Sequence, residues 1–155
     1  MVASYQAKLQ HHQPQAYPIT SEFMSRSFVK VSPDTDIYTA MDLLVDHKIS
    51  GAPVVNDHDE LLGFISEKDC LALMTHDAYE SNLPGGSVAQ YMTQNVRTLK
   101  PEAGLNEAAD IFMHTPYRKL PVVDQHNQVV GIVRRREVLL EIRAFFGQRM
   151  ADLRA

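Results

Sequence analysis

Hydrophobic and polar positions follow the same order twice along this chain. When the sequence is shifted by 68 positions, residues 24–69 align with residues 92–137 without a gap. The sequence Pro-Val-Val at 53–55 then coincides with the same three residues at 121–123. A duplicated pattern of this length predicts two copies of one supersecondary unit.

Each copy is typical of a β-α-β-β-α unit. The first begins with a β-type run over Phe28–Val31, closed by Pro33 because proline cannot continue a central strand. The next segment has apolar residues at the spacing of one helix face, namely Ile37, Ala40, Met41, Leu44 and Val45. Strands over 52–55 and 61–66 and a helix over about 67–75 complete the unit.

The second copy predicts the same elements. A β-type run over 96–99 precedes a helix with apolar positions at Leu105, Ala108, Ala109, Phe112 and Met113. Strands follow over 120–123 and 129–133, and then a helix over about 135–150. That helix has an apolar stripe that needs a partner: Val138, Leu139, Ile142, Phe145 and Phe146. The methionines Met41 and Met113 are interpreted as core residues.

The expected fold class is α+β, with two repeats related by a pseudo-two-fold axis and small sheets packed by helices. The first repeat is assigned to residues 20–76 and the second, with the C-terminal helix, to 88–150. Residues 1–19 form an N-terminal extension that is mobile or packs on a partner, and residues 77–87 form a polar linker before a short helix at 88–92.

Six segments carry a resemblance to a known family. They are FMSRSFVKVSPDT, ISGAPVVN and LLGFISEKD in the first copy, and YMTQNVRTLKPEA, YRKLPVVD and VVGIVRRRE in the second. In order and spacing they resemble a tandem pair of cystathionine β-synthase (CBS) domains, or Bateman module, of the stand-alone bacterial type. The resemblance implies two three-stranded sheets, clefts that bind adenine nucleotides or related adenosyl ligands, and disc-shaped homodimers that pair through helices.

Composition excludes several classes of protein. The chain has 155 residues, 45% of them hydrophobic and 22% charged, which is the balance of an ordinary globular protein. No apolar run approaches the roughly 20 residues of a membrane-spanning helix, and no secretory signal is visible, so no membrane insertion is expected. Cys70, the single cysteine, cannot form an internal disulfide, which favours a reducing cytoplasm.

The net charge of −4 is unevenly distributed. Residues 1–87 carry 5 basic and 12 acidic side chains, whereas residues 88–155 carry 10 and 7. The overall acidity argues against nucleic-acid binding, and the asymmetry is either a solvated surface or part of a ligand site.

Ser66 and Asp69 are the first candidate ligand residues. Ser66 lies where a strand runs into a helix and is suited to cap it, while Asp69 in the first turn stabilises the helix dipole. The resemblance gives them a second role, because Gly-x-x-Ser/Thr-x-x-Asp is the family's ribose site. It also places the adenine beside Val29, Ala52 and Pro53, whose alternative role is core packing, with Ser27 as a further hydroxyl or a plain loop residue.

Phosphate groups need cations, and the second copy supplies them. The resemblance places Arg118 and Lys119 where they reach across the cleft to a phosphate. Arg134 coincides with Ser66 and offers a fork of donors, or else belongs to a solvated junction. Glu137 replaces the aspartate of the second copy, so that site departs from the pattern. One nucleotide per chain is preferred, and two remain an alternative.

Catalytic chemistry has little support in the sequence. Pro84-Gly85-Gly86 lacks the Lys-Ser/Thr of a phosphate loop, and no histidine has metal-ligand spacing. We therefore expect a non-catalytic regulatory sensor of AMP, ADP or ATP that requires no cofactor or metal and acts on an effector protein in trans. The alternatives are a structural dimerisation module with vestigial clefts and a sensor of S-adenosylmethionine.

Overall fold

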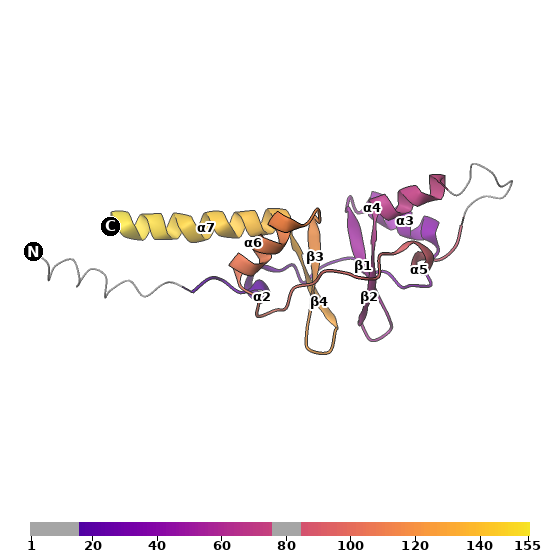
Figure 1. Cartoon of the computed structure of the whole chain (residues 1–155), viewed down its shortest axis with the longest axis horizontal. Helices are drawn as coiled ribbons and strands as arrows, with labels where there is room; N and C mark the ends of the chain where they lie inside the picture. The colour runs from indigo at the N-terminus through magenta and orange to yellow at the C-terminus, as the bar shows by residue number, and fades with distance from the viewer. Residues whose placement is uncertain (1–15, 76–84) are drawn as a thin grey trace, which may run out of the picture.

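The computed structural model describes residues 16–75 and 85–155, which form two lobes side by side (Figure 1). Lobe 1 consists of α3 (Ile37–Asp46), β1 (Gly51–Val55), β2 (Leu61–Ser66), α4 (Glu67–Cys70) and the 3-10 helix η1 (Leu71–Met74). Lobe 2 consists of α6 (Leu105–His114), β3 (Lys119–Val123), β4 (Val129–Arg134) and α7 (Arg135–Arg154). Two short helices, α2 (Thr20–Phe23) and α5 (Val88–Tyr91), precede the lobes. The predicted α+β class with two equivalent units is confirmed.

Each lobe contains a two-stranded antiparallel sheet, β1–β2 or β3–β4. The predicted first strands are reduced to single parallel bridges, Val31 to Val54 and Leu99 to Val122. Val31 donates to the Pro53 carbonyl and accepts from Val55 N–H, but the next ladder bond would need an N–H on Pro53. Proline has none, so the pairing stops there, and Pro121 has the same effect in lobe 2. The expectation of three-stranded sheets was therefore wrong in this respect.

The two short helices pack on the opposite lobe from the repeat that they begin. Helix α2 contacts β4 and α7 of lobe 2, whereas α5 contacts α3 and β2 of lobe 1. Antiparallel bridges from Ser25 to Ile132 and from Phe64 to Thr93 fix this exchange. The Thr20 hydroxyl, fully buried, donates to the Ala103 carbonyl at 2.8 Å. Neither lobe is therefore complete without the leading segment of the other repeat.

The hairpin turns join the lobes a second time. Leu61 N–H donates to the Asn127 carbonyl at 3.0 Å, and Val129 N–H donates to the Asp59 carbonyl at 2.9 Å. These two bonds are related by the same 68-residue shift, so the pseudo-two-fold axis exchanges one for the other. Together with the exchanged helices they connect the two lobes and so define the space between them.

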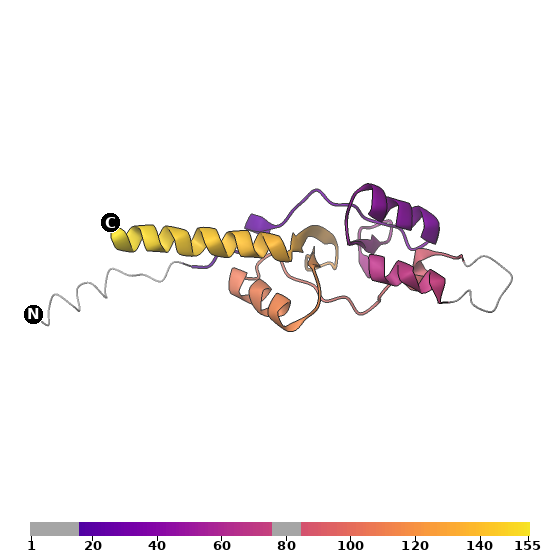
Figure 2. The same cartoon turned by 90° about the horizontal axis from the view of Figure 1, so that it is seen from above.

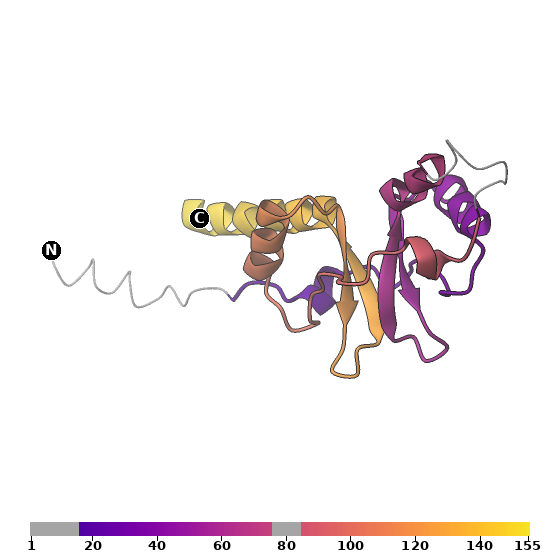
Figure 3. The same ribbon diagram turned by 45° about the vertical axis from the view of Figure 1, so that its right-hand side comes forward.

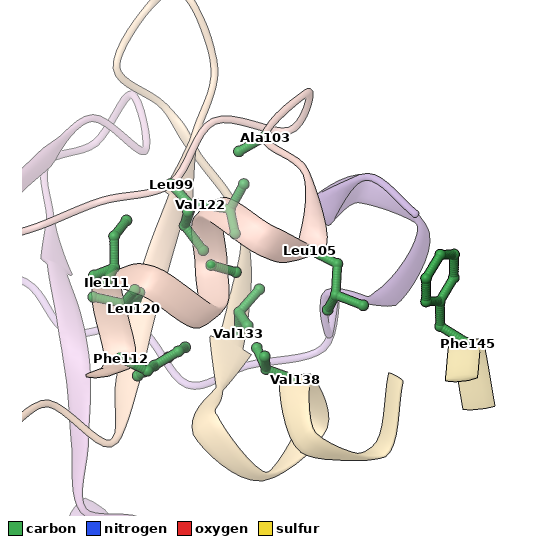
Figure 4. Close-up of a cluster of buried hydrophobic side chains, with 11 residues drawn as sticks. Leu99, Ala103, Leu105, Ile111, Phe112, Leu120, Val122, Val133, Val138 and Phe145 are labelled. Atoms are coloured by element: carbon green, nitrogen blue, oxygen red, sulfur yellow. The ribbon is translucent and has the colours of Figure 1, made fainter. Parts of the chain in front are cut away.

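Each lobe has its own hydrophobic core. The core of lobe 2 lies between α6, the β3–β4 sheet and the first turns of α7, as Figure 4 shows for Leu105, Leu120, Val133 and Val138. The predicted inner faces of α3 and α6 are buried in part only. Val45 and Met113, at equivalent positions, are 68% and 78% exposed, so the interpretation of Met113 as a core residue was wrong.

The second repeat ends in a helix of 20 residues that extends beyond α6 and both sheets (Figures 2 and 3). Its predicted stripe divides into two parts, because Val138 and Phe145 are buried while Leu139 and Phe146 are exposed. The Tyr17 ring packs against Phe145 at a centroid distance of 5.1 Å, so residues 16–19 lie on lobe 2. The predictions for residues 1–15 and for the linker at 76–84 lie outside the described residues.

The helix predicted after Ser66 is shorter and tighter than expected. It is α-helical only over α4 and continues as the 3-10 turn η1. None of the helices in the described ranges has the length and apolar character needed to cross a membrane.

Candidate functional site

A cleft of about 750 Å³ opens between the lobes. Lobe 1 contributes the end of β2 and the start of α4, and lobe 2 contributes the loop before β3 and the start of that strand. The segment that follows α5 forms a third wall. The cleft is lined by Ser50, Phe64, Ser66, Glu67, Lys68, Asp69, Leu71, Ala72, Tyr91, Thr93, Val96, Arg97, Pro116, Tyr117, Arg118, Lys119, Leu120 and Pro121.

Asp69 presents a fixed carboxylate to this cleft. Its Oδ2 atom accepts from Ser66 N–H at 2.9 Å and from the Ser66 hydroxyl at 2.9 Å. The Ser66 hydroxyl in turn accepts from Asp69 N–H at 3.1 Å, which completes a capping box at the start of α4. The Oδ1 atom has no hydrogen-bond partner among the described residues. Asp69 can therefore accept hydrogen bonds from a ligand without giving up its cap.

The opposite wall is basic. Arg118 and Lys119 of lobe 2 line the same cleft as Asp69, and Arg97 lines it as well. The Lys119 ammonium is half-buried and donates to the Gly51 carbonyl of lobe 1 at 2.9 Å. Burial lowers the pKa of Lys119, and the nearby charge of Arg134 lowers it further, while Glu137 and Glu67 act in the opposite direction. A cation held in this way favours an anionic group of a ligand, since the anion would offset the desolvation of the ammonium.

In the second copy the residues equivalent to Ser66 and Asp69, which are Arg134 and Glu137, bind each other. Glu137 Oε2 accepts from Arg134 N–H at 2.9 Å, and Oε1 accepts from the Arg134 guanidinium at 2.8 Å. Both oxygens therefore have a partner, whereas Asp69 leaves one oxygen available. Arg134 is accordingly the N-cap residue of α7 and forms an ion pair with Glu137, and neither residue lines the cleft described above.

The structure brings together only part of the predicted site. Ser66, Asp69, Arg118 and Lys119 line one cleft, but Ser27, Val29, Ala52 and Pro53 do not. Ala52 and Pro53 are almost completely buried within β1. The family resemblance had placed the adenine beside Val29, Ala52 and Pro53, at the mouth of the cleft that holds Asp69. In the folded chain the wall opposite Asp69 comes from the other repeat.

Shifting these positions by 68 identifies the wall correctly. Arg97, Leu120 and Pro121 are the counterparts of Val29, Ala52 and Pro53, and all three line the cleft. Sequence reasoning also missed Tyr91 and Tyr117, although each is the first residue of a segment that carries the family resemblance. The 68-residue shift between the repeats could therefore have identified Arg97, Leu120 and Pro121 from the sequence. It could not have identified the two tyrosines.

Among the described residues, this cleft has no clear centre for metal binding or for chemistry at a cysteine thiol. Among the described residues, no group of three or more His, Cys, Asp or Glu side chains is placed to hold a metal ion. Cys70 follows Asp69 but is buried in lobe 1. Burial raises the pKa of its thiol, and Asp69 and Glu67 raise it further, so the thiol stays protonated and unreactive.

Known proteins match both the sequence and the fold. Inosine-5'-monophosphate dehydrogenase from Methanocaldococcus jannaschii is 30% identical over 130 residues, which make up 84% of this chain and 25% of that enzyme. The chain therefore spans about a quarter of the length of that relative. The crystal structure of CBSX2 in complex with AMP has a TM-score of 0.72 and 31% identity, over 84% of this chain and 98% of CBSX2. CBSX2 is a CBS-pair protein from Arabidopsis thaliana.

A second solved structure supports the fold alone. The CBS domain pair of protein MJ0100, in complex with 5'-methylthioadenosine and S-adenosyl-L-methionine, has a TM-score of 0.69 and 23% identity, over 85% of this chain and 98% of that one. The family model of the CBS domain matches residues 20–76 and 88–144. Because these two segments make up most of the sequence, the chain belongs to the CBS domain family and carries the domain as a tandem pair.

Proposed function

We propose that this protein is a non-catalytic regulatory sensor that binds one adenine nucleotide per chain in the cleft between its lobes. One observation supports the proposal: Asp69, whose Oδ1 atom has no hydrogen-bond partner among the described residues, lines the same cleft as the cations Arg118 and Lys119. A nucleoside phosphate has ribose hydroxyls that can donate to Asp69 and a phosphate that can accept from Arg118 and Lys119. The AMP complex of CBSX2, at 31% identity, supports the same ligand class.

Within the cleft each group of a nucleotide has a suitable neighbour. The two ribose hydroxyls would donate to Asp69 Oδ1, and the phosphate would accept from Arg118 and Lys119. Val96 and Pro121 offer apolar surface to the base. S-adenosylmethionine is a weaker candidate because its sulfonium and amino groups bring positive charge toward Arg97, Arg118 and Lys119.

Regulation would follow from the position of the cleft. Because a ligand touches both lobes, it stabilises the lobe arrangement that it binds best and shifts the population toward that arrangement. We propose that two copies associate through their helices, which bear exposed apolar residues at equivalent positions in both lobes. These are Val45 and Met113, and Leu71 and Leu139. We propose that the protein acts in the cytoplasm. An effector protein there would respond to the change in lobe arrangement.

Calorimetric titration tests the ligand and its stoichiometry. AMP, ADP and ATP are expected to bind at one site per chain, and S-adenosylmethionine more weakly. Single occupancy follows from the Arg134–Glu137 pair, which uses both carboxylate oxygens of the second copy. Two equal sites per chain would overturn the single-site prediction. No heat from any nucleotide, with folded protein, would favour a structural module instead.

Lys119 should give phosphate binding a distinctive pH dependence. Because a bound phosphate favours the ammonium, it raises the lowered pKa of Lys119, and binding takes up a proton near that pKa. The affinity for AMP is therefore expected to fall as pH rises through the pKa of the unliganded protein, below the ordinary value of 10.5. Titrations of AMP and adenosine from neutral to alkaline pH measure this effect.

Adenosine serves as the control ligand because it lacks the phosphate, so its affinity should change less with pH. In the variant Lys119→Met the difference between AMP and adenosine should shrink. An unchanged pH dependence in this variant would assign the effect to another cation of the cleft.

A further inference from the structure

Lys119 places a half-buried amine at the cleft between the lobes. It lines the cleft, and its ammonium donates to the Gly51 carbonyl of lobe 1 at 2.9 Å. Gly51 is its counterpart in the first repeat, 68 positions earlier, so that repeat has no lysine at the equivalent position. An ammonium has three N–H groups, and the bond to Gly51 uses one of them. The Nζ atom is therefore held at the cleft and can still react there.

Positive charge is crowded around this amine. In the antiparallel register of β3 and β4, Lys119 lies directly opposite Arg134, and Arg118 precedes it in the chain. Burial and the charge of Arg134 lower the pKa of Lys119, whereas Glu137 and Glu67 act in the opposite direction. Only a neutral amine has the lone pair that a nucleophile needs. These surroundings therefore favour the reactive form of the side chain.

The same cleft provides donors for a phosphate group. Arg97 and Arg118 line it, both are exposed, and neither forms an ion pair with any residue that the structure describes. Guanidinium groups stay charged in proteins and bind phosphate oxygens through two parallel N–H donors. They would offset the charge of a bound phosphate, so Lys119 need not stay protonated to do so.

We propose that Lys119 is a modification site, acylated by small acyl phosphates whose phosphate group is held by Arg97 and Arg118. In an acyl phosphate one bridging oxygen joins the phosphate to the carbonyl carbon, so an amine beside the phosphate is also beside that carbon. The neutral Nζ atom attacks the carbon, the bond from carbon to the bridging oxygen breaks, and an amide forms. Inorganic phosphate leaves with the bonding electron pair, and the proton lost by nitrogen passes to it or to water.

Acylation would change what the cleft binds. The amide has no charge and one N–H, so the modified side chain could keep its bond to the Gly51 carbonyl but would lose its attraction for a phosphate. Under the proposed function, the acylated protein should bind AMP less tightly and bind adenosine about as before. The reaction itself does not depend on that function, because it needs only the acyl phosphate, the arginines and Lys119.

Lys68 is an internal control for this reaction. It lines the same cleft, but it is exposed and lies between Glu67 and Asp69 in the chain. The full chain is incubated with acetyl phosphate, and mass spectrometry of its peptides measures the rate of acetylation at each lysine. The rate at Lys119 is expected to exceed that at Lys68 by about tenfold, because the amine is both less often protonated and closer to the bound reagent.

A second reagent separates phosphate recognition from the reactivity of the amine. N-acetoxysuccinimide also acetylates lysines but has no phosphate. With acetyl phosphate, the double variant Arg97→Gln and Arg118→Gln should lower the ratio of the two rates by about tenfold, since hydrogen bonds between charged groups are lost. With N-acetoxysuccinimide the ratio should hardly change. Arg136→Gln, at an exposed position of α7 outside the cleft, is the matched control and should leave both ratios unchanged.

Equal rates at Lys119 and Lys68 with acetyl phosphate would overturn the proposal. A ratio that the arginine replacements do not lower would overturn it as well. Circular dichroism checks that each variant folds. In the unsubstituted protein, added inorganic phosphate should slow acetylation of Lys119 more than that of Lys68, which tests the phosphate contact without any substitution.

Nucleotide titration of the same protein separates this proposal from the function above. A protein that is acetylated selectively at Lys119 but binds no nucleotide keeps the modification site and loses the sensor. A protein that binds AMP but is acetylated no faster at Lys119 than at Lys68 keeps the sensor and loses the modification site.

Discussion

Replacing Asp69 with alanine is expected to weaken adenine-nucleotide binding by at least about tenfold, since hydrogen bonds to a charged group contribute roughly 1.5 to 3 kcal/mol. The expected loss comes from the Oδ1 atom, which has no hydrogen-bond partner among the described residues, whereas Oδ2 accepts from Ser66. Calorimetry with AMP measures it. The effect should be as large for adenosine as for AMP, because the carboxylate is assigned to the ribose and not to the phosphate.

The second repeat supplies a matched control for this substitution. Glu137 is the counterpart of Asp69 and likewise accepts from the backbone N–H of the N-cap residue, but both of its carboxylate oxygens are engaged by Arg134. Glu137→Ala should therefore reduce stability through loss of a cap, by about 1 kcal/mol, and leave the affinity nearly unchanged. Equal losses of affinity in both variants would contradict the assignment of the site to Asp69.

Replacing Gly63 with valine is expected to destabilise the fold by about 1 to 3 kcal/mol, the range for overpacking a buried position. A Cβ atom at Gly63 would lie 2.6 Å from the Met92 sulfur and 2.8 Å from the Thr93 carbonyl oxygen. The side chain of Met92 can move, but the backbone of Thr93 is held by its bridge to Phe64. Urea unfolding followed by circular dichroism measures the change.

Gly147 is the control for Gly63. It lies in α7, where a Cβ atom would meet nothing within 4 Å. Gly147→Ala should stabilise the protein by roughly 0.5 to 1 kcal/mol, because alanine has the higher helix propensity. If Gly63→Val were no more harmful than a surface substitution, the exchanged packing of residues 92–93 on lobe 1 would be wrong.

These two expectations depend on the same structural feature, the exchange of leading segments between the lobes. Thr93 pairs with Phe64, and the chain then continues through Val96 and Arg97, which form the third wall of the cleft. Disruption at Gly63 should therefore also lower nucleotide affinity. The fold and the site are coupled through this segment, which belongs to one repeat in sequence and to the other lobe in space.

Sequence pattern was sufficient for the secondary structure nearest the site. The strand over 61–66 and the helix start at Glu67 were predicted, because alternating apolar residues followed by Ser66 and Asp69 are a local signal. The same reasoning failed for Phe28–Val31 and its counterpart. Their β-type residues are strand formers, but the lack of an N–H on Pro53 and Pro121 limits their pairing to one bridge each. That limit lies on a different segment, so local propensity does not reveal it.

Burial on the helices shows a similar division. Helical periodicity identified Ile37, Ala40 and Leu44 as inner residues of α3, and all three are buried. It also assigned Val45 and Met113 to the core, although both are exposed. Periodicity indicates the apolar side of a helix but not how wide a strip of it the sheet covers, which depends on the position of neighbouring elements.

By itself, the sequence determined two copies of one unit, the family to which they belong, and the residues Ser66 and Asp69 at a strand-to-helix junction. These features are local or repeat at a fixed interval, so they can be read along the chain. Only the tertiary structure decided which residues face Asp69. The repeats exchange their leading segments about a pseudo-two-fold axis, and each wall of a cleft therefore comes from a different repeat. The contact between Lys119 and the Gly51 carbonyl, 68 residues apart, expresses that same symmetry.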